Sequence, residues 1–398
     1  MLPLTTIPLA IDGGEPVRRT MLPYGRQWVD EDDIRAVVDV LRSDWLTTGP
    51  KVVEFEQAFA ACVGSKYAIA FSSGTAALHS ATFAASLGPG DEAITTPLTF
   101  VATSNCILYV GARPVFADVR NDTLTIEPKQ IESNLTPRTK AIIPSDYGGQ
   151  PCDMEEINSI AERHSLVVIE DAAHSLGATY KGRRVGTLAK MTVFSTHPVK
   201  LITTGEGGIV TTDDAVLARR LRQFRNHGIT TEVRERKDGW FYEMESIGYN
   251  YRITDLQCAL GLSQLAKAED FLKKRRIIAQ RYDEAFRSLP EVEIPVQLVD
   301  RTSAWHLYAI RLRLDKLRVG RLEVFRALRA ENIGVNVHYI PVPWHPYYQK
   351  LGYNRGECPK AERIYEQLLT LPIFPVMTDR DVDDVIRAVH KVISAYQH

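Results

Sequence analysis

The sequence predicts an α/β protein built on a mostly parallel sheet, with a smaller α/β part at its C-terminal end. From about residue 50 to 225, short apolar and β-branched runs alternate with helical segments, which is typical of successive β-α-β units. A long helical pattern covers residues 255–289, and strand and helix patterns then alternate again. The 398 residues are 44% apolar, which is enough for a substantial core.

The elements can be assigned in order along the chain. Residues 1–29 are expected to form an extended arm, and residues 30–42 an amphipathic helix that starts at an acidic residue. Strands are expected at 67–71, 92–96, 113–117, 141–144, 166–170, 192–195 and 208–211. The C-terminal part is expected to contain strands at 304–312 and 335–339 and helices at 321–331 and 360–369. This divides the chain into an arm (1–29), a large domain (30–265), and a linking helix with a small domain (266–398).

The composition excludes several classes of protein. A net charge of −1 argues against a nucleic-acid or membrane-surface binder. No apolar stretch approaches the roughly 20 residues of a membrane-spanning helix, and the N-terminus lacks the features of a signal peptide. The 5 cysteines are widely spaced without a Cys-x-x-Cys motif, which is typical of reduced thiols in a cytoplasmic protein.

One lysine follows a predicted strand at the start of a polar loop. Residues 192–195 are typical of a buried strand, and the loop presents Lys200 before a Gly-rich turn at 205–208. A lysine amine withdrawn from water has a lowered pKa and attacks carbonyl groups, as a Schiff-base enzyme requires. An ordinary solvated surface lysine is the alternative for this residue considered alone.

A carboxylate follows another predicted strand. Four consecutive apolar residues at 166–169 are typical of a strand buried on both faces of a parallel sheet, and the run ends in Glu170 and Asp171. Ligands of open α/β sheets bind beyond the carboxyl ends of the strands. Asp171 is therefore a candidate partner for the ring nitrogen of pyridoxal phosphate, which such a carboxylate keeps protonated. Capping of a following helix is the alternative.

A third motif has the form strand, Ser-Gly-Thr turn, helix. Ser73, Gly74 and Thr75 follow the strand at 67–71 and precede an apolar helical segment. The free N–H groups and dipole of a helix N-terminus bind anions such as phosphate, and a glycine allows the anion close to the backbone. An ordinary helix cap explains the same residues, and the Gly-Lys-[Ser/Thr] ending of a nucleotide P-loop is missing.

In this order the three motifs resemble the sugar-nucleotide aminotransferases of the DegT/DnrJ/EryC1/StrS family, within the aspartate-aminotransferase (fold type I) group. The resemblance extends over nearly the whole chain and includes residues 23–27 (PYGRQ), 44–50 (DWLTTGP) and 336–341 (NVHYIP). It implies the PLP-dependent transferase fold type I: a large domain with a mostly parallel seven-stranded sheet and a smaller C-terminal α/β domain. It also implies pyridoxal 5'-phosphate as the cofactor.

The resemblance also implies roles for individual residues. Lys200 would hold the cofactor and carry protons, and Asp171 would stabilise the protonated ring nitrogen. Further cofactor contacts are implied for Ser73, Gly74, Thr75, Phe100, His174, Ser195 and Asn250. Asn250 would come from the neighbouring subunit of a homodimer with shared active sites, and the charged segment 230–238 would reach toward that neighbour. Core packing is the alternative for Phe100, and a core or capping position for His174.

Contacts with the substrate are implied for Tyr24, Arg26, Thr48, Arg252 and His338. His338 and His345 also suggest metal ligation, but no third ligand is evident, so an aromatic surface is the preferred interpretation and no metal is expected. Arginine side chains suit both carboxylates and diphosphates because their planar fork binds two oxygens at once.

The expected function is amino transfer from L-glutamate to the C4 keto group of a nucleotide-linked 4-keto-6-deoxy sugar. Residues 197–200 and 248–252 most resemble the pseudaminic-acid branch of the family, whose substrate is UDP-2-acetamido-2,6-dideoxy-β-L-arabino-hex-4-ulose. Other UDP-, dTDP- or GDP-linked keto sugars are alternatives, because Asp146 and Thr196 depart from the family's usual His and Phe. A sugar 3-dehydratase would carry His in place of Lys200, and a non-catalytic sugar-nucleotide sensor would not need the Asp171/Lys200 pair.

Overall fold

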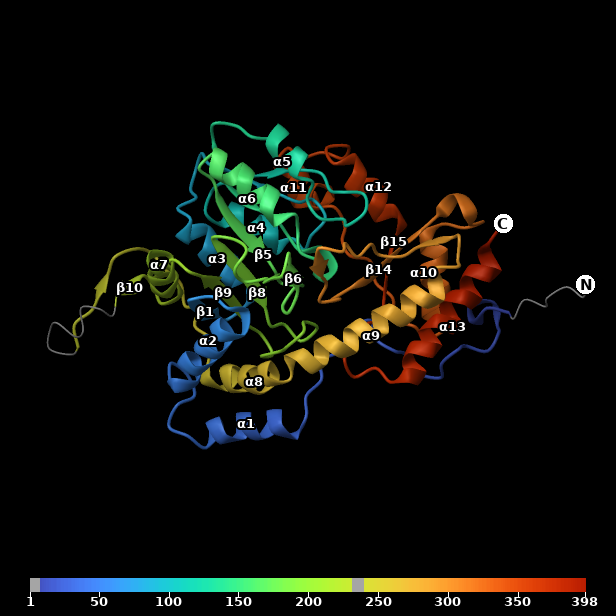
Figure 1. Ribbon diagram of the computed structural model, residues 1–398, viewed down its shortest axis with the longest axis horizontal. Helices are drawn as coiled ribbons and strands as arrows, with labels where there is room; N and C mark the ends of the chain where they lie inside the picture. The colour runs from blue at the N-terminus through green and yellow to red at the C-terminus, as the bar shows by residue number, and fades with distance from the viewer. Residues whose placement is uncertain (1–7, 231–239) are drawn as a thin grey trace, which may run out of the picture.

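The computed structural model describes residues 8–230 and 240–398 and is built around a seven-stranded sheet (Figure 1). Its strands are β1 (Tyr67–Phe71), β2 (Glu92–Thr95), β3 (Arg113–Phe116), β4 (Thr139–Ile143), β5 (Val167–Asp171), β8 (Met191–Ser195) and β9 (Gly208–Thr212). Their order across the sheet is β1-β9-β8-β5-β4-β2-β3. Strand β9 is antiparallel to both neighbours, and the other pairs are parallel. The predicted mostly parallel sheet is confirmed.

Both faces of this sheet are covered by helices, which is why its strands are continuously apolar. Alternate residues of a strand point to opposite faces, so Val168 packs into one apolar cluster and Ile169 into the other. The first cluster includes side chains of α2 (Pro50–Val63), α6 (Met154–Arg163) and α8 (Asp255–Ala266). The second includes side chains of α3 (Gly74–Ala84), α4 (Ala102–Tyr109) and α7 (Ala215–Arg225).

The helical pattern predicted as one segment over 255–289 forms two helices. Helix α8 ends at Ala266, and α9 (Ala268–Phe286) starts after Lys267 and runs toward the C-terminal part (Figure 1). The Lys267 amine lies 2.7 Å from a carboxylate oxygen of Asp30, which precedes α1 (Glu31–Leu41), and 2.8 Å from one of Asp33 within that helix. The break lets α8 pack on the large sheet while α9 contributes Tyr282 and Phe286 to a separate C-terminal core.

The C-terminal part has its own antiparallel sheet and a set of helices. The sheet order is β12-β14-β15. Its elements are β12 (Val292–Glu293), β14 (Tyr308–Leu312), α10 (Arg321–Ala330), α11 (Pro346–Lys350), α12 (Pro359–Gln367), β15 (Leu368–Leu371) and α13 (Asp379–Tyr396). Helix α13 was not among the predicted elements. The remaining elements are α5 (Pro128–Ser133), β6 (Thr179–Tyr180), β7 (Arg183–Arg184), β10 (Ile229–Thr230), β11 (Glu243–Met244), β13 (Arg301–Thr302) and four short 3-10 turns, Ala10–Asp12, Tyr147–Gly149, Leu314–Lys316 and Val342–Trp344.

The predicted strand at 335–339 is wrong. This segment makes a single bridge, between Asn336 and Thr370, and β15 takes its place in the small sheet. The reason lies in its bonds to the large part: the Tyr147 hydroxyl donates to the His338 carbonyl oxygen at 2.5 Å. The segment therefore contacts the small sheet at Asn336 and is bonded to the large part at His338.

The N-terminal arm packs on the C-terminal part. Leu9 and Leu22 belong to the C-terminal core, and the buried Glu331 carboxylate accepts hydrogen bonds from the backbone N–H groups of Ala10 (2.9 Å) and Val17 (2.8 Å). The arm therefore joins the same core as α13. The boundaries proposed at 29/30 and 265/266 stay predictions.

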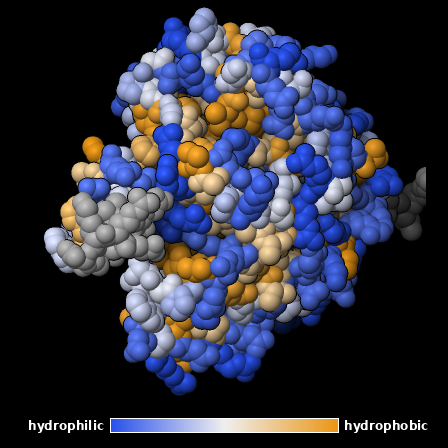
Figure 2. All heavy atoms as spheres, turned by 60° about the vertical axis from the view of Figure 1, so that its left-hand side comes forward, coloured by the Kyte–Doolittle hydropathy of each residue, from blue (hydrophilic) through white to orange (hydrophobic). Residues whose placement is uncertain are grey.

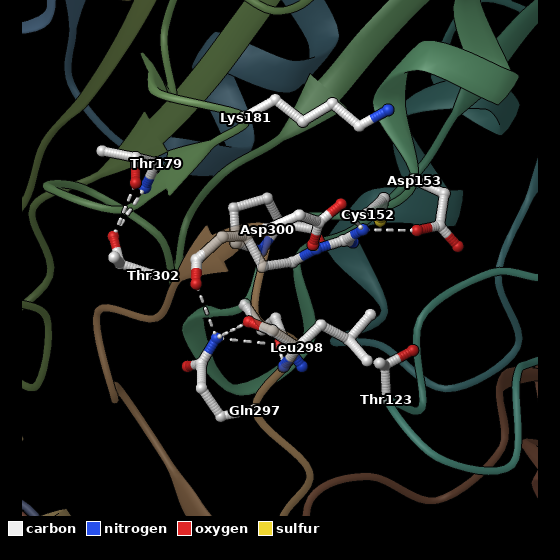
Figure 3. A network of polar contacts seen from close by, with 12 residues as sticks. Thr123, Cys152, Asp153, Thr179, Lys181, Gln297, Leu298, Asp300 and Thr302 are labelled. Carbon is white, nitrogen blue, oxygen red and sulfur yellow. Dashed lines mark hydrogen bonds and ion pairs between the residues drawn. The ribbon is translucent and has the colours of Figure 1, made fainter.

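The segment between α9 and β14 is fastened to the large part (Figure 3). The Thr302 and Thr179 hydroxyls lie 2.8 Å apart, and the Leu298 N–H donates to the Gln150 side-chain oxygen at 2.8 Å. Further on, the Ala304 N–H donates to the Gly149 carbonyl at 2.9 Å. These bonds hold the entry to β14 against the strand ends of the large sheet.

Candidate active site

Three of the sequence motifs meet at one edge of the large sheet. Phe71 and Ser195, the last residues of β1 and β8, both pair with Gly208. Asp171, the last residue of β5, pairs with Val193. This is the edge formed by the carboxyl ends of the parallel strands, where ligands of open α/β sheets bind.

The Ser-Gly-Thr turn forms a tight cradle at this edge. Ser73 caps α3, because its hydroxyl accepts a hydrogen bond from the Ala76 N–H at 3.1 Å. A Cβ added at Gly74 would lie 3.0 Å from Ser195 Cβ, and one at Gly208 would lie 2.4 Å from the Ser73 carbonyl oxygen. Both glycines therefore allow a close approach of backbones that a side chain would prevent. Thr75 occupies the first turn of α3 and is half-buried.

Asp171 is a buried carboxylate with two donors. Its Oδ2 accepts from the Thr103 hydroxyl at 2.6 Å and its Oδ1 from the Ala173 N–H at 3.1 Å. Burial raises its pKa, while these hydrogen bonds and the charge of Lys200 act in the opposite direction. The chain continues from β5 into turns rather than into a helix, so Asp171 does not cap a helix.

Lys200 lies in the loop between β8 and β9. Burial of its amine lowers the pKa of Lys200 to about 8, against an opposing effect of Asp171, and the charge of Arg275 lowers it further. The amine lies 3.4 Å from His306 Nε2. A lysine whose amine is about half neutral near pH 8 is suited to attack a carbonyl group.

Aromatic and histidine side chains form the opposite side of the site. His174, in the turn after β5, is buried, and its Nε2 lies 3.1 Å from the Tyr339 hydroxyl. Its ring centroid is 4.3 Å from that of His306. Burial holds the pKa of both histidines well below the usual value, so both rings are neutral near pH 7.

Two residues of the N-terminal arm, Tyr24 and Arg26, also lie at the site. The Tyr24 ring lies 5.4 Å from the His338 ring, and Arg26 and Lys200 line one small crevice. His338 is buried, and its Nδ1 lies 2.9 Å from the Thr370 hydroxyl. The structure thus brings Tyr24, Arg26 and His338 to the side of the site formed by the arm and the C-terminal part.

Phe100 and Asn250 are exposed. The Phe100 side chain is 57% accessible and its ring lies 6.2 Å from that of Tyr339, so Phe100 does not belong to the core. Asn250 precedes Tyr251, whose carbonyl accepts a hydrogen bond from the Ser72 N–H at 2.8 Å. The Asn250 backbone therefore runs close to the Ser-Gly-Thr turn of its own chain. Of the segment 230–238, residues 231–238 lie outside the described residues.

Thr48 and Arg252 lie together, in a separate groove of about 360 Å³. Arg252 donates to the Asn226 side chain at 2.8 Å, and Arg219, Arg222 and Arg225 also line this groove. Lys200 does not line this groove. The single chain therefore does not bring Thr48 and Arg252 to Lys200.

The sequence motifs did not single out Thr103, Arg275, His306 or Tyr339. Thr103 and Arg275 lie inside helices α4 and α9, where a single polar residue gives no signal of function in the sequence. Tyr339 lies next to His338 within the 336–341 motif and was the easiest to find. His306 has no spacing relation to Lys200, because packing over more than one hundred residues of chain brings them together.

Two of the residues that depart from the family pattern are buried and internally bonded. Asp146 accepts from the Ser175 hydroxyl at 2.5 Å and from the Cys152 N–H at 2.9 Å, and burial raises the pKa of Asp146 to about 6. The Thr196 and Thr204 hydroxyls lie 2.6 Å apart. These residues support the strand ends from within and do not line the open side of the site.

The comparison with protein families decides the identity. The model of the DegT/DnrJ/EryC1/StrS aminotransferase family matches residues 27–390. The chain belongs to this family. It is therefore a pyridoxal-phosphate-dependent aminotransferase of fold type I, as the motifs predicted.

Three relatives illustrate the likeness. SpsC of Bacillus subtilis, a spore coat polysaccharide biosynthesis protein, is 46% identical over 381 residues, 94% of this chain and 98% of that protein. Helicobacter pylori PseC, an aminotransferase involved in the biosynthesis of pseudoaminic acid, is 34% identical with a TM-score of 0.89, covering 94% of this chain and 100% of that chain. The putative sugar aminotransferase Spr1654 of Streptococcus pneumoniae, in its PMP-form, is 31% identical with a TM-score of 0.90, over 94% and 99%.

The residues present fit pyridoxal phosphate. The cradle at Gly74 and Gly208 presents a helix N-terminus that suits a phosphate. The buried Asp171 carboxylate suits a cationic ring nitrogen, and the Lys200 amine suits an aldehyde carbon.

The five cysteines are free thiols. Among the described residues no helix is both long and apolar enough to cross a membrane.

Proposed function

We propose that the protein transfers an amino group from L-glutamate to the C4 keto group of a nucleotide-linked 4-keto-6-deoxy sugar. The observation that carries the proposal is the placement of Lys200 and Asp171 at one strand edge, with a lowered lysine pKa and a buried carboxylate. Membership of an aminotransferase family and likeness to proteins described as sugar aminotransferases support the sugar as the acceptor.

Within this class we propose UDP-2-acetamido-2,6-dideoxy-β-L-arabino-hex-4-ulose as the substrate. The product would be UDP-4-amino-4,6-dideoxy-N-acetyl-β-L-altrosamine, an intermediate of pseudaminic acid. Likeness to the H. pylori enzyme at 34% identity supports this choice. The motifs at 197–200 and 248–252 support it as well.

A second candidate is another UDP-, dTDP- or GDP-linked keto sugar destined for a surface polysaccharide. The observation that favours it is the higher identity, 46%, to a spore coat polysaccharide biosynthesis protein. Asp146 and Thr196 lie behind the strand ends, so any influence they have on the choice of sugar acts through the position of the site residues.

The chain's own groups account for the catalytic steps. When bound, pyridoxal phosphate supplies an electron sink that stabilises negative charge developing on the donor's α-carbon. Lys200 Nζ would hold the cofactor, and when free it would accept the proton from the donor's α-carbon as a general base. Asp171, held by Thr103, would keep a positive charge on the ring nitrogen. The first turn of α3 would bind the phosphate.

The experiment is a substrate panel. Purified protein with pyridoxal phosphate and glutamate is incubated with UDP-, dTDP- and GDP-linked 4-keto sugars, and the products are identified by mass spectrometry. Conversion of the UDP-N-acetyl sugar with the L-arabino configuration in preference to the others supports the specific proposal. Preference for another sugar supports the second candidate, and no amination of any sugar contradicts the class.

We propose that the active form is a homodimer with shared sites. Large apolar side chains are exposed on segments around β10 and β11, among them Trp240 (72% accessible), Met244 (66%) and Ile247 (77%). Figure 2 shows apolar patches on the side of the molecule that carries this segment. Exposed apolar surface of this kind marks protein interfaces, and a two-fold dimer is the commonest closed assembly.

We also propose that the reaction takes place in the cytoplasm, because free thiols are typical of proteins there.

Subunit complementation tests the shared site. Inactive Lys200→Ala and inactive Asn250→Ala proteins are mixed and allowed to exchange subunits. If Asn250 serves the neighbour's site, each mixed dimer contains one intact site and regains up to about half of wild-type activity. Demonstrated exchange without recovery would show that Asn250 serves its own chain, near whose Ser-Gly-Thr turn its backbone lies.

A further inference from the structure

The His306 side chain contacts the Lys200 amine. The distance from Lys200 Nζ to His306 Nε2 is 3.4 Å, a long contact of the kind that tightens when a site is occupied. His306 is 8% accessible and lies just before β14, so the contact joins the large sheet to the C-terminal part. No motif pointed to this residue.

The backbone around His306 is fixed from two sides. On one side, the buried Arg275 of α9 donates to the carbonyl oxygens of Trp305 (3.2 Å), His306 (3.3 Å) and Ile373 (2.8 Å). On the other side, the Leu307 N–H donates to the Gly148 carbonyl of the large part at 3.1 Å. His306 is therefore held at a set distance from the loop that carries Lys200.

The direction of the hydrogen bond between Lys200 and His306 follows from their protonation states. Burial lowers the pKa of His306 well below the usual value, and the charge of Lys200 acts in the same direction. A neutral imidazole has one bare nitrogen, and an ammonium group can only donate. When the lysine is charged, Nε2 therefore accepts from Nζ and Nδ1 carries the proton. His306 Nδ1 has no hydrogen-bond partner within the described part of the chain.

We propose that His306 is a positioning residue that holds the Lys200 amine at the site whenever this amine is not covalently bound. The proposal deepens the proposed function, on which it rests, because an aminotransferase frees its lysine in every catalytic cycle. Without a partner, a lysine side chain has several rotamers. The contact with Nε2 restricts them and keeps Nζ beside the reacting atoms.

The test measures the Lys200 amine in cofactor-free protein. Carbamylation of Lys200 by cyanate is followed by mass spectrometry as a function of pH. In the wild type, reactivity should reach half its maximum at about pH 8. His306→Phe removes the acceptor from the charged form, so the midpoint should fall by about one pH unit, the effect of a hydrogen bond to a charged group. His306→Gln retains an acceptor and should keep the wild-type midpoint.

The matched control is His390→Phe, which removes a histidine of the C-terminal part that contacts the Ala285 carbonyl, and it should leave the midpoint unchanged. An unchanged midpoint in His306→Phe would overturn the proposal. Equal shifts in His306→Phe and His306→Gln would also overturn it, because they would indicate a purely steric role.

A reciprocal measurement covers the case in which His306→Phe does not fold. In Lys200→Met the histidine loses a cationic neighbour, so the pKa of His306 should rise, as read from the NMR signals of labelled histidine. An unchanged His306 titration contradicts the contact. Neither measurement requires cofactor or sugar, so failure of the substrate panel leaves this proposal testable.

Discussion

The two walls of the site are built in different ways. The strand-end wall comprises residues 73–75, Asp171, Ser195 and Lys200, and it follows directly from strands that end at one edge. The C-terminal wall comprises His306, His338 and Tyr339, and it depends on distant packing through Arg275 and Tyr147. The first wall carries charge that chemistry needs, whereas the second consists of neutral rings. This difference predicts that the strand-end wall governs turnover and that the C-terminal wall tunes it.

The largest effect is expected for Lys200→Ala. Turnover should fall by about 10⁴-fold or more, because the covalent and proton-transfer roles disappear together. In the wild type with pyridoxal phosphate, borohydride should bleach a visible absorption band and fix the cofactor on Lys200 in mass mapping. The exposed Lys181, which pairs with Glu155, provides the control: Lys181→Ala should retain activity. An adduct on another lysine would contradict the prediction that Lys200 binds the cofactor.

The second-largest effect is expected for Asp171→Asn. The substitution keeps the side-chain size but removes the charge that holds the ring nitrogen protonated, so the half-reaction with glutamate should slow by about 10²–10⁴-fold. The measurement is the rate of the spectral change on adding glutamate, together with cofactor binding, which should persist. Asp214→Asn alters a helix cap at α7 and should leave that rate unchanged. Near-normal turnover in Asp171→Asn would contradict the role of the carboxylate.

Arg275→Met tests the residue that holds the backbone of the C-terminal wall. Three carbonyl oxygens lose their donor, so the free energy of unfolding in urea should fall by about 2–4 kcal/mol. The nearby positive charge that lowers the pKa of Lys200 also disappears. The midpoint of Lys200 carbamylation should therefore rise above about pH 8, opposite in sign to the shift expected for His306→Phe. A downward shift would mean that the guanidinium charge does not act on the amine.

The smallest effects are expected from removing one hydroxyl from each wall. Thr103→Val removes a donor from Asp171, which raises the pKa of the carboxyl and should slow turnover about tenfold. Tyr339→Phe removes the partner of the already neutral His174 and should cost only about two- to fivefold. Steady-state rates at pH 7 compare the two. A larger loss in Tyr339→Phe than in Thr103→Val would reverse the ranking of the walls.

The same difference explains what the sequence could predict. Asp171 and Lys200 were predictable because each follows a short apolar run, and strands of a parallel sheet end at one edge. The site's other side was not, since His306 and Arg275 reach it through packing between distant segments. The strand wrongly expected at 335–339 has the same cause: its β-branched pattern is local, but the bond from Tyr147 to the His338 carbonyl is not. The break between α8 and α9 at Lys267 was not predicted either, and its ion pairs there are with the distant Asp30 and Asp33.

The antiparallel strand β9 has a consequence for how the enzyme can change over evolution. Because β8 and β9 run in opposite directions, the Lys200 loop leaves and re-enters the sheet at the same edge. The loop is closed by bonds from the Thr196 N–H to the Gly207 carbonyl (3.0 Å) and from the Thr204 N–H to the Thr196 carbonyl (3.0 Å). An inserted or deleted residue here would displace the lysine, so the length of this loop is constrained. The C-terminal segments of the site are held instead by bonds to other parts of the chain, such as the one from the Leu307 N–H to the Gly148 carbonyl (3.1 Å), so a change of length between those bonds would not directly displace the lysine.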